Sequence, residues 1–246
     1  MSNLSHTCIH HEAAPAIAIC TECDGDICAA CHGTDLRGYC ICAGCREKFA
    51  PPQTAWEDPQ TDFSPATFGT TLWDALKSPR TFFTKVRPVG PAAPAVSFGL
   101  IAMTVGMLFS NTWKLLFVDA FGEALAELAK EMSASMEMVR ASMFLAVPLQ
   151  VGLAFLLHLG ALHMALRIAG ARPKLSATAR VVGYASAGYI LMVLPPIGEF
   201  MLGHFMAIMW VFNLQMGALT MHYRLGTWKT LAVVMGTLLI ILPLAF

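Results

Sequence analysis

The sequence is poor in charged residues and has no excess of either sign. Asp, Glu, Lys and Arg make up 13% of the 246 residues, and 16 acidic residues balance 16 basic ones. Soluble domains are closer to about a quarter charged, whereas 56% of this chain is apolar and its mean hydropathy is +0.59. This composition argues against a wholly soluble protein. The lack of net positive charge also argues against a nucleic-acid-binding protein held by a general basic field.

The N-terminus lacks a secretory signal, and the C-terminal part lacks cysteine. The chain opens Met-Ser-Asn-Leu-Ser-His, which has neither the basic nor the apolar region of such a signal. We therefore expect it to start in the cytoplasm, where thiols stay reduced. All eight cysteines lie between Cys8 and Cys45, whereas the long apolar runs begin near Ala92. This division predicts a cysteine-rich head at residues 1–50 and a separate apolar part.

The metal-ligating residues of the head occur in pairs with two residues between the members. The pairs are Cys8 with His11, Cys20 with Cys23, Cys28 with Cys31, and Cys42 with Cys45. Two intervening residues let a tight turn aim two side chains at one ion, and zinc takes four such ligands tetrahedrally. The pairs predict two closed zinc sites, which are structural rather than catalytic. In a reducing compartment, zinc is favoured over the alternative of an extracellular disulfide knot.

Interleaved ligation is predicted, because only four residues separate Cys23 from Cys28 and successive pairs would crowd each other. The first zinc is expected on Cys8, His11, Cys28 and Cys31, and the second on Cys20, Cys23, Cys42 and Cys45. Three neighbouring residues are alternate ligands: His10, His32 and Cys40. The order of the pairs resembles the B-box type of zinc finger over about residues 8–45. Many B-boxes have histidines where this chain has its last pair of cysteines.

The head has six acidic and three basic residues within residues 1–50. This balance argues against binding to a phosphate backbone. A head of about fifty residues cannot bury much core, so metal binding is expected to supply most of its folding free energy. We expect it to bind a cytoplasmic protein or to act as architecture, and we expect no nucleic-acid partner.

Two further segments separate the head from the first long apolar run. Residues 51–67 are rich in Pro, Gln, Thr and Asp, which predicts a linker. Residues 68–90 mix aromatic rings with Lys and Arg, and Ser78 before Pro79 predicts a helix start. Amphipathic helices at the cytoplasmic membrane surface are favoured, with rings at headgroup depth. The alternative is a soluble helix hairpin packed on the head.

Five segments within residues 91–246 are apolar and long enough, or nearly so, to cross about 30 Å of hydrocarbon. They are residues 95–113, 141–166, 181–197, 200–221 and 228–246. The third is short and ends at Pro195-Pro196, which allows a tight hairpin with the fourth. Residues 119–140 repeat apolar side chains at steps of three and four. This repeat predicts an amphipathic helix on the outer surface or over the bundle. The expected fold is a small zinc-stabilised cross-brace finger followed by an all-α five-helix transmembrane bundle.

The distribution of Lys and Arg is an independent test of this topology. With the N-terminus inside, ten lie on inner flanks and three on the outer side. The ten are Lys77, Arg80, Lys85, Arg87, Arg167, Arg172, Lys174, Arg180, Arg224 and Lys229, and the three are Lys114, Lys130 and Arg140. The predicted C-terminus therefore lies on the side opposite the cytoplasm.

Short motifs in the apolar part resemble the Yip family of Ypt/Rab-interacting five-span membrane proteins. They are Trp73, Ser78-Pro79-Arg80-Thr81-Phe82-Phe83 and Val182-Gly183-Tyr184-Ala185-Ser186, and the similarity covers about residues 68–246. The resemblance implies a bundle associated with membrane organisation or trafficking. A B-box-like head on such a bundle resembles a bacterial arrangement, which implies the inner cell membrane. The chain departs from the family at Ala187 and Gly188, near which many members have a proline.

Four ionisable residues fall inside or beside the predicted spans. His158 and His163 lie in the second span, and Glu199 and His204 lie near the start of the fourth. Such residues are functional candidates by default. The members of each pair are five residues apart, which separates their side chains by about 140° on a helix, and no His-Glu-x-x-His motif is present. Hydrogen bonding between helices is therefore the favoured role.

The favoured function is a non-enzymatic membrane scaffold or adaptor whose zinc finger serves protein–protein interaction. The expected partners are the lipid bilayer and a cytoplasmic protein, and a homo-oligomer is left open. The alternative is an ion or small-solute channel or transporter that uses the intramembrane His and Glu residues. A membrane enzyme is the weakest hypothesis, because no catalytic motif is present.

Overall fold

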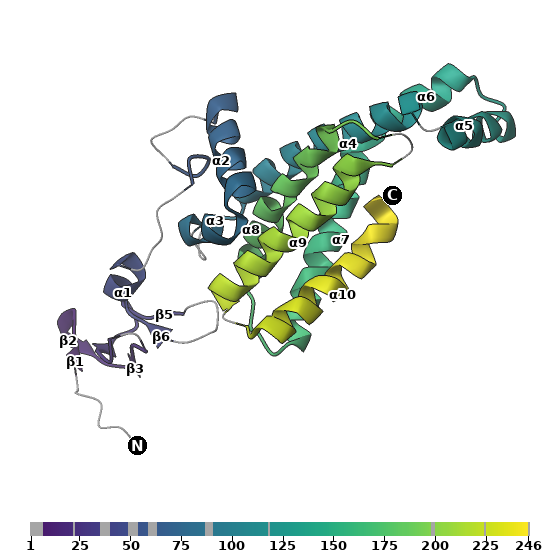
Figure 1. The fold of residues 1–246 in the computed structure, drawn as a ribbon. Coiled ribbons are helices and arrows are strands. Elements are labelled where there is room, and N and C mark those ends of the chain that lie inside the picture. The colour runs from purple at the N-terminus through teal and green to yellow at the C-terminus, as the bar shows by residue number, and fades with distance from the viewer. Residues whose placement is uncertain are drawn as a thin grey trace.

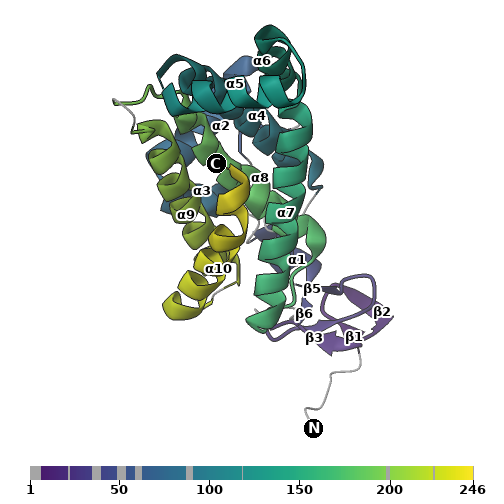
Figure 2. The same cartoon turned by 90° about the vertical axis from the view of Figure 1, so that its right-hand side faces the viewer.

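The computed structural model describes residues 7–21, 23–34, 40–48, 54–58, 63–86, 91–117, 119–197, 200–223 and 225–245. They form a small head of short strands and a larger bundle of helices (Figure 1). The two views agree that the head lies near the end of the bundle where α7 (Val147–Ile168) ends and α10 (Thr227–Ala245) begins (Figures 1 and 2). The hairpin of α5 (Asp119–Glu131) and α6 (Met136–Leu145) lies at the opposite end.

The head is built from three antiparallel two-stranded hairpins and one short helix. The hairpins pair β1 (Thr7–Cys8) with β2 (His11–Pro15), β3 (Ala18–Ile19) with β4 (Asp26–Ile27), and β5 (Gly33–Thr34) with β6 (Cys40–Ile41). Helix α1 (Ala43–Lys48) follows. Its small core consists of Ile27, Ile41 and the buried cysteines. So few apolar side chains cannot stabilise a domain by burial alone.

Two helices precede the first long apolar helix. Helix α2 (Pro65–Lys77) begins with a capping box, in which the Ser64 and Thr67 side chains each bond to the other residue's backbone N–H. Helix α3 (Pro79–Lys85) has its proline at the first position, as Ser78-Pro79 predicts.

The structure differs from the expectation of rings at headgroup depth for Phe82 and Phe83. Both are only 1% exposed, because α3 packs against α9 (Leu202–Tyr223). The Phe82 ring meets Tyr184 edge to face, with centroids 5.4 Å apart. These two rings therefore belong to the protein core, whereas Trp73 on α2 stays 64% exposed.

Three helices are long and apolar enough to cross a membrane: α4 (Ala93–Phe117), α7 and α9. The described apolar part of α10, Thr227–Ile240, is shorter. Large apolar side chains project outward from these helices, among them Leu149, Leu156 and Leu239, which are 76%, 65% and 66% exposed. Together these features indicate a membrane protein.

The predicted third span is not one continuous α-helix over residues 181–197. Helix α8 (Leu175–Ala185) begins six residues earlier and continues as the 3₁₀ helix η1 (Ser186–Val193). At the junction, the Ser186 hydroxyl donates to the Val182 carbonyl at 2.8 Å, a back-bond that commonly bends helices. The pair α8–η1 is buried among α4 and α9.

The predicted outer helix and second span have different boundaries in the structure. A turn after Glu131 separates α5 from α6, and Ser133 there has a φ of 51°. Ser135 then caps α6 by accepting from the Met138 N–H at 3.2 Å. A second break at Ala146 precedes α7, whose first turn contains proline. Apolar periodicity continues through both breaks and therefore cannot locate them.

Close packing of α4 against α8 gives the first testable prediction. A Cβ added at Gly183 would collide with the Ala95 carbonyl, and one at Gly99 would lie 2.7 Å from the Gly183 oxygen. Gly183→Ala should therefore force the helices apart and cost about 1–3 kcal/mol of stability. Gly160, on α7, has nothing within 4 Å of such a Cβ. Thermal unfolding in detergent should show a lower midpoint for Gly183→Ala than for Gly160→Ala, and equal midpoints would contradict the packing.

Candidate metal centre

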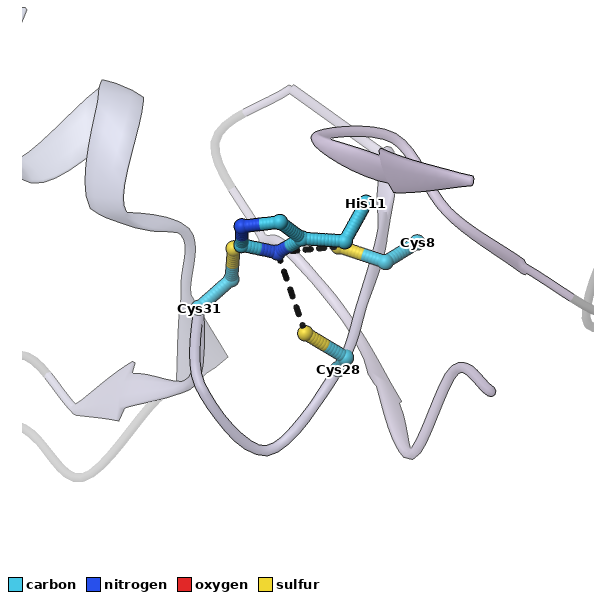
Figure 3. A group of neighbouring side chains, drawn as sticks. All are labelled: Cys8, His11, Cys28 and Cys31. Atoms are coloured by element: carbon cyan, nitrogen blue, oxygen red, sulfur yellow. Dashed lines mark hydrogen bonds between the residues drawn. The ribbon is translucent and has the colours of Figure 1, made fainter. Parts of the chain in front are cut away.

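The first quartet brings together Cys8, His11, Cys28 and Cys31 (Figure 3). The β1–β2 hairpin supplies Cys8 and His11, and the turn after β4 supplies Cys28 and Cys31. The His11 Nδ1 atom lies 3.9, 3.4 and 3.2 Å from the Sγ atoms of Cys8, Cys28 and Cys31, respectively. The three cysteines are buried, and the histidine lies at the surface.

The second quartet brings together Cys20, Cys23, Cys42 and Cys45. The Sγ atoms of Cys23 and Cys42 are 3.9 Å apart. Backbone N–H groups donate to two of the sulfurs at 3.2 Å: Cys42 to Cys20, and Cys45 to Cys42. Such bonds favour the thiolate, which is the form that binds metal.

Both quartets fit a tetrahedral zinc ion. Zinc bonds of about 2.3 Å to sulfur and about 2.0–2.1 Å to nitrogen place ligand atoms about 3.6–3.8 Å apart. The ligand atoms of each quartet all lie within 4.8 Å of one another. The structure therefore brings together the eight predicted ligands in the predicted interleaved pairing, and each group could hold one metal ion.

A tight turn positions the second quartet. The Cys20 N–H donates to the Gly25 carbonyl at 2.8 Å, and the Asp24 N–H donates to the Cys20 carbonyl at 2.9 Å. Asp24 has a φ of 54°, a conformation that Asp tolerates better than most residues. A Cβ on Gly25 would lie 3.4 Å from the Cys23 sulfur. The Asp-Gly sequence thus lets the chain turn sharply beside a ligand.

The protonation chemistry of the first quartet favours a bound cation. Burial raises the pKa of Cys31 to about 12, and the neighbouring thiols of Cys8 and Cys28 add to the rise. Burial also acts to raise the pKa of Cys8, but backbone N–H groups of His10 and Cys28 lower it to about 6. Hydrogen bonding to Cys28 raises the pKa of His11. Sulfurs this close cannot all ionise without a compensating charge, and a divalent ion supplies it.

The three alternate ligands lie outside both quartets. The His10 ring is beside α1, where it would be 3.3 Å from a Cβ on Gly44. His32 and Cys40 contact each other instead, with Nε2 and Sγ 3.3 Å apart.

The intramembrane histidines are paired with polar groups on neighbouring helices. His158 of α7 bonds to Gln215 of α9, His163 of α7 to Thr178 of α8 at 3.1 Å, and His204 of α9 to Ser110 of α4 at 2.8 Å. Glu199 lies outside the described residues. Each histidine has its own partner, so the structure gives them separate roles in helix contact. The sequence offered no signal for the partners Gln215, Thr178 and Ser110.

Residues 54–58, which the sequence predicts as linker, pack instead on the bundle, and we call them the strap. Glu57 forms an ion pair with Arg180 of α8, with Oε2 and the guanidinium nitrogen 2.7 Å apart. The two side chains are only 7% and 3% exposed. Arg180 also donates to the Pro91 carbonyl at 2.8 Å.

Two neighbouring strap residues add further contacts. Trp56 donates from Nε1 to the Pro94 carbonyl at 2.7 Å and from its backbone to the Thr71 hydroxyl at 3.0 Å. The Thr54 hydroxyl bonds to the Tyr184 hydroxyl at 3.1 Å. The proline-rich composition predicts a linker and gives no sign that this segment docks on the bundle. Arg180 is predicted only as one of the positive charges on the inner membrane flanks.

Metal content is the direct test of the quartets. After dialysis against zinc-free buffer, the full chain should retain about two zinc ions, and Cys31→Ser should lower the count by about one or more. Cys40→Ser is the matched control, because Cys40 lies outside both quartets, and it should keep both ions. Lowering the pH should release zinc as the ligand thiolates take up protons. Elemental analysis measures the count, and an unchanged count in Cys31→Ser would contradict the assignment.

Comparisons of the chain with family models, curated proteins and solved structures found no match. The likeness to B-box fingers and to the Yip family therefore stays a prediction from short motifs. The functional inference therefore rests on the residues of the head, the strap and the bundle, and not on a related protein.

Proposed function

We propose that this protein is a non-enzymatic membrane scaffold or adaptor, in which a zinc-stabilised head presents a protein-binding surface at the cytoplasmic face. The strap is the observation that carries the proposal. Only residues 49–53 separate the end of α1 from Thr54, a stretch that reaches about 20 Å at most. Because the buried Glu57–Arg180 pair anchors the strap, the head is held near the bundle rather than on a long tether.

The arrangement of charge supports a cytoplasmic head. The head lies near the end of the bundle where α7 ends and α10 begins (Figure 2). Arg167, Arg172, Lys174 and Lys229 flank those same helix ends, and such residues favour the cytoplasmic side. The hairpin α5–α6, with four glutamates, lies at the far end.

A five-span, Yip-like bundle is part of the proposal. Helices rise about 1.5 Å per residue in the α form and about 2.0 Å in the 3₁₀ form. On these values the 11 residues of α8 and the 8 residues of η1 add up to about 33 Å of helix. This length matches the hydrocarbon thickness of about 30 Å.

Exposed apolar side chains on the head support a protein partner. Ile9 and Ile17 are 59% and 56% exposed. Their backbone N–H groups bond to the carbonyls of Asp26 and Ile27, both at 2.8 Å, so both residues flank β4. These two exposed isoleucines beside one strand offer apolar side chains on which a protein partner could pack.

Partner recruitment is tested by pulldown from solubilised membranes. Wild type should capture a partner that Cys20→Ser, which breaks the second quartet, fails to capture. Ile17→Asp should also lose it while keeping about two zinc ions. Glu12→Gln, on exposed β2, is the control and should behave as wild type. Retention of every wild-type partner by an inserted Cys20→Ser variant would count against recruitment by the head.

The anchoring role of the strap is tested by comparing a buried with an exposed ion pair. Glu57→Gln leaves Arg180 buried without its charge partner and should cost about 3–5 kcal/mol. Asp74→Asn removes the partner of Lys85, an exposed pair at 2.8 Å, and should cost about 0–1 kcal/mol. Hydrogen exchange at residues 54–58 should accelerate only in Glu57→Gln, with zinc content unchanged. Equal protection in both variants would contradict the anchor.

A further inference from the structure

A further pair of potential metal-ligating atoms lies on the head, apart from both quartets. His32 Nε2 and Cys40 Sγ are 3.3 Å apart. This separation falls within the 3.2–3.9 Å range between His11 Nδ1 and the sulfurs of the first quartet. The pair therefore has the spacing of two ligands on one zinc ion.

The pair is held in place by the fold. Cys40 lies in β6, which pairs with β5, and His32 immediately precedes β5, so the β5–β6 hairpin brings the two residues together. The Cys40 carbonyl accepts from the backbone N–H and the hydroxyl of Thr21, at 2.9 and 3.0 Å. Thr21 belongs to the turn that carries Cys20 and Cys23. These contacts fix the Cys40 backbone against the second quartet.

Neither quartet uses Cys40, so its thiol is available for a further ligand role. The two quartets account for the other seven cysteines of the chain. His32 is exposed and Cys40 is partly exposed, so a ligand from solvent or from another molecule can approach them. Zinc prefers four protein ligands in a structural site, and this pair provides two.

We propose that His32 and Cys40 form half of a third zinc site, which a second copy of this chain completes with the same two residues. A zinc ion on a two-fold axis would then have two imidazole and two thiolate ligands, a common structural donor set. Copies inserted in one bilayer share one orientation, so a two-fold axis normal to the membrane brings their heads together on one side. Confinement to the membrane also raises the effective concentration of the second pair.

The inference is independent of the proposed scaffold function, because it requires only that the head folds. The experiment uses the full chain in detergent, with the two zinc ions of the quartets still bound. A phosphine reductant is present to prevent disulfides. Zinc is added beyond two equivalents, and mass is measured by sedimentation velocity. Wild type should shift from monomer to dimer and bind about 2.5 zinc ions per chain, because one ion is shared.

His32→Ala and Cys40→Ser should each weaken zinc-dependent dimerisation by about tenfold or more, while both tight ions stay bound. His10→Ala is the matched control, because His10 lies against α1 rather than beside Cys40. It should dimerise as wild type does. The proposal is overturned if added zinc leaves the wild type monomeric, if His32→Ala dimerises equally well, or if a third ion binds each chain without dimerisation.

Discussion

The buried ion pair between Glu57 and Arg180 fixes how the N-terminal segments meet the bundle. Removing two charges from water costs several kcal/mol per ion, so such a pair persists only with close geometry and further hydrogen bonds. Here the charged atoms are 2.7 Å apart, and Arg180 also binds the Pro91 carbonyl. The pair joins segments 123 residues apart in the chain. Next to Glu57, Trp56 lies near Phe98 of α4 and Phe68 of α2, with ring centroids 6.2 and 5.7 Å apart, so the strap contacts both helices.

Polar contacts between distant segments also occur in the interior of the bundle. His158, His204 and Arg180 all lie on apolar helices, and each bonds to a residue from another segment. Because hydrocarbon offers no hydrogen bonds, such contacts select which helices can be neighbours and at what height. Glycines bring the backbones of α4 and α8 close together, whereas these polar contacts join other pairs of segments.

Features that rest on local chemistry could be predicted from the sequence, and features that rest on distant contacts could not. The spacing of Cys20 and Cys23 places both on one turn, and the other three pairs have the same spacing. These pairs, with the crowding that disfavours successive pairing, predict the composition of both quartets. Hydropathy likewise located α4, α7 and α9. The docking of Trp56 and Glu57 depends on residues far along the chain, which no local pattern encodes. The 3₁₀ segment η1 packs closely on α9, since a Cβ on Gly188 would lie 2.8 Å from the Val211 nitrogen, and this contact between distant residues is also absent from any local pattern.

Interleaving of the quartets also sets an order for the maturation of the head. Cys31 completes the first quartet, whereas the second needs Cys45, which leaves the ribosome fourteen residues later. An ion in the first quartet would close a loop between His11 and Cys28 that contains Cys20 and Cys23, half of the second quartet. A metal ion could therefore load the first quartet before the second as the chain emerges. Without an ion in the first quartet, that loop would lose its closure, so the first site would help to position half of the second.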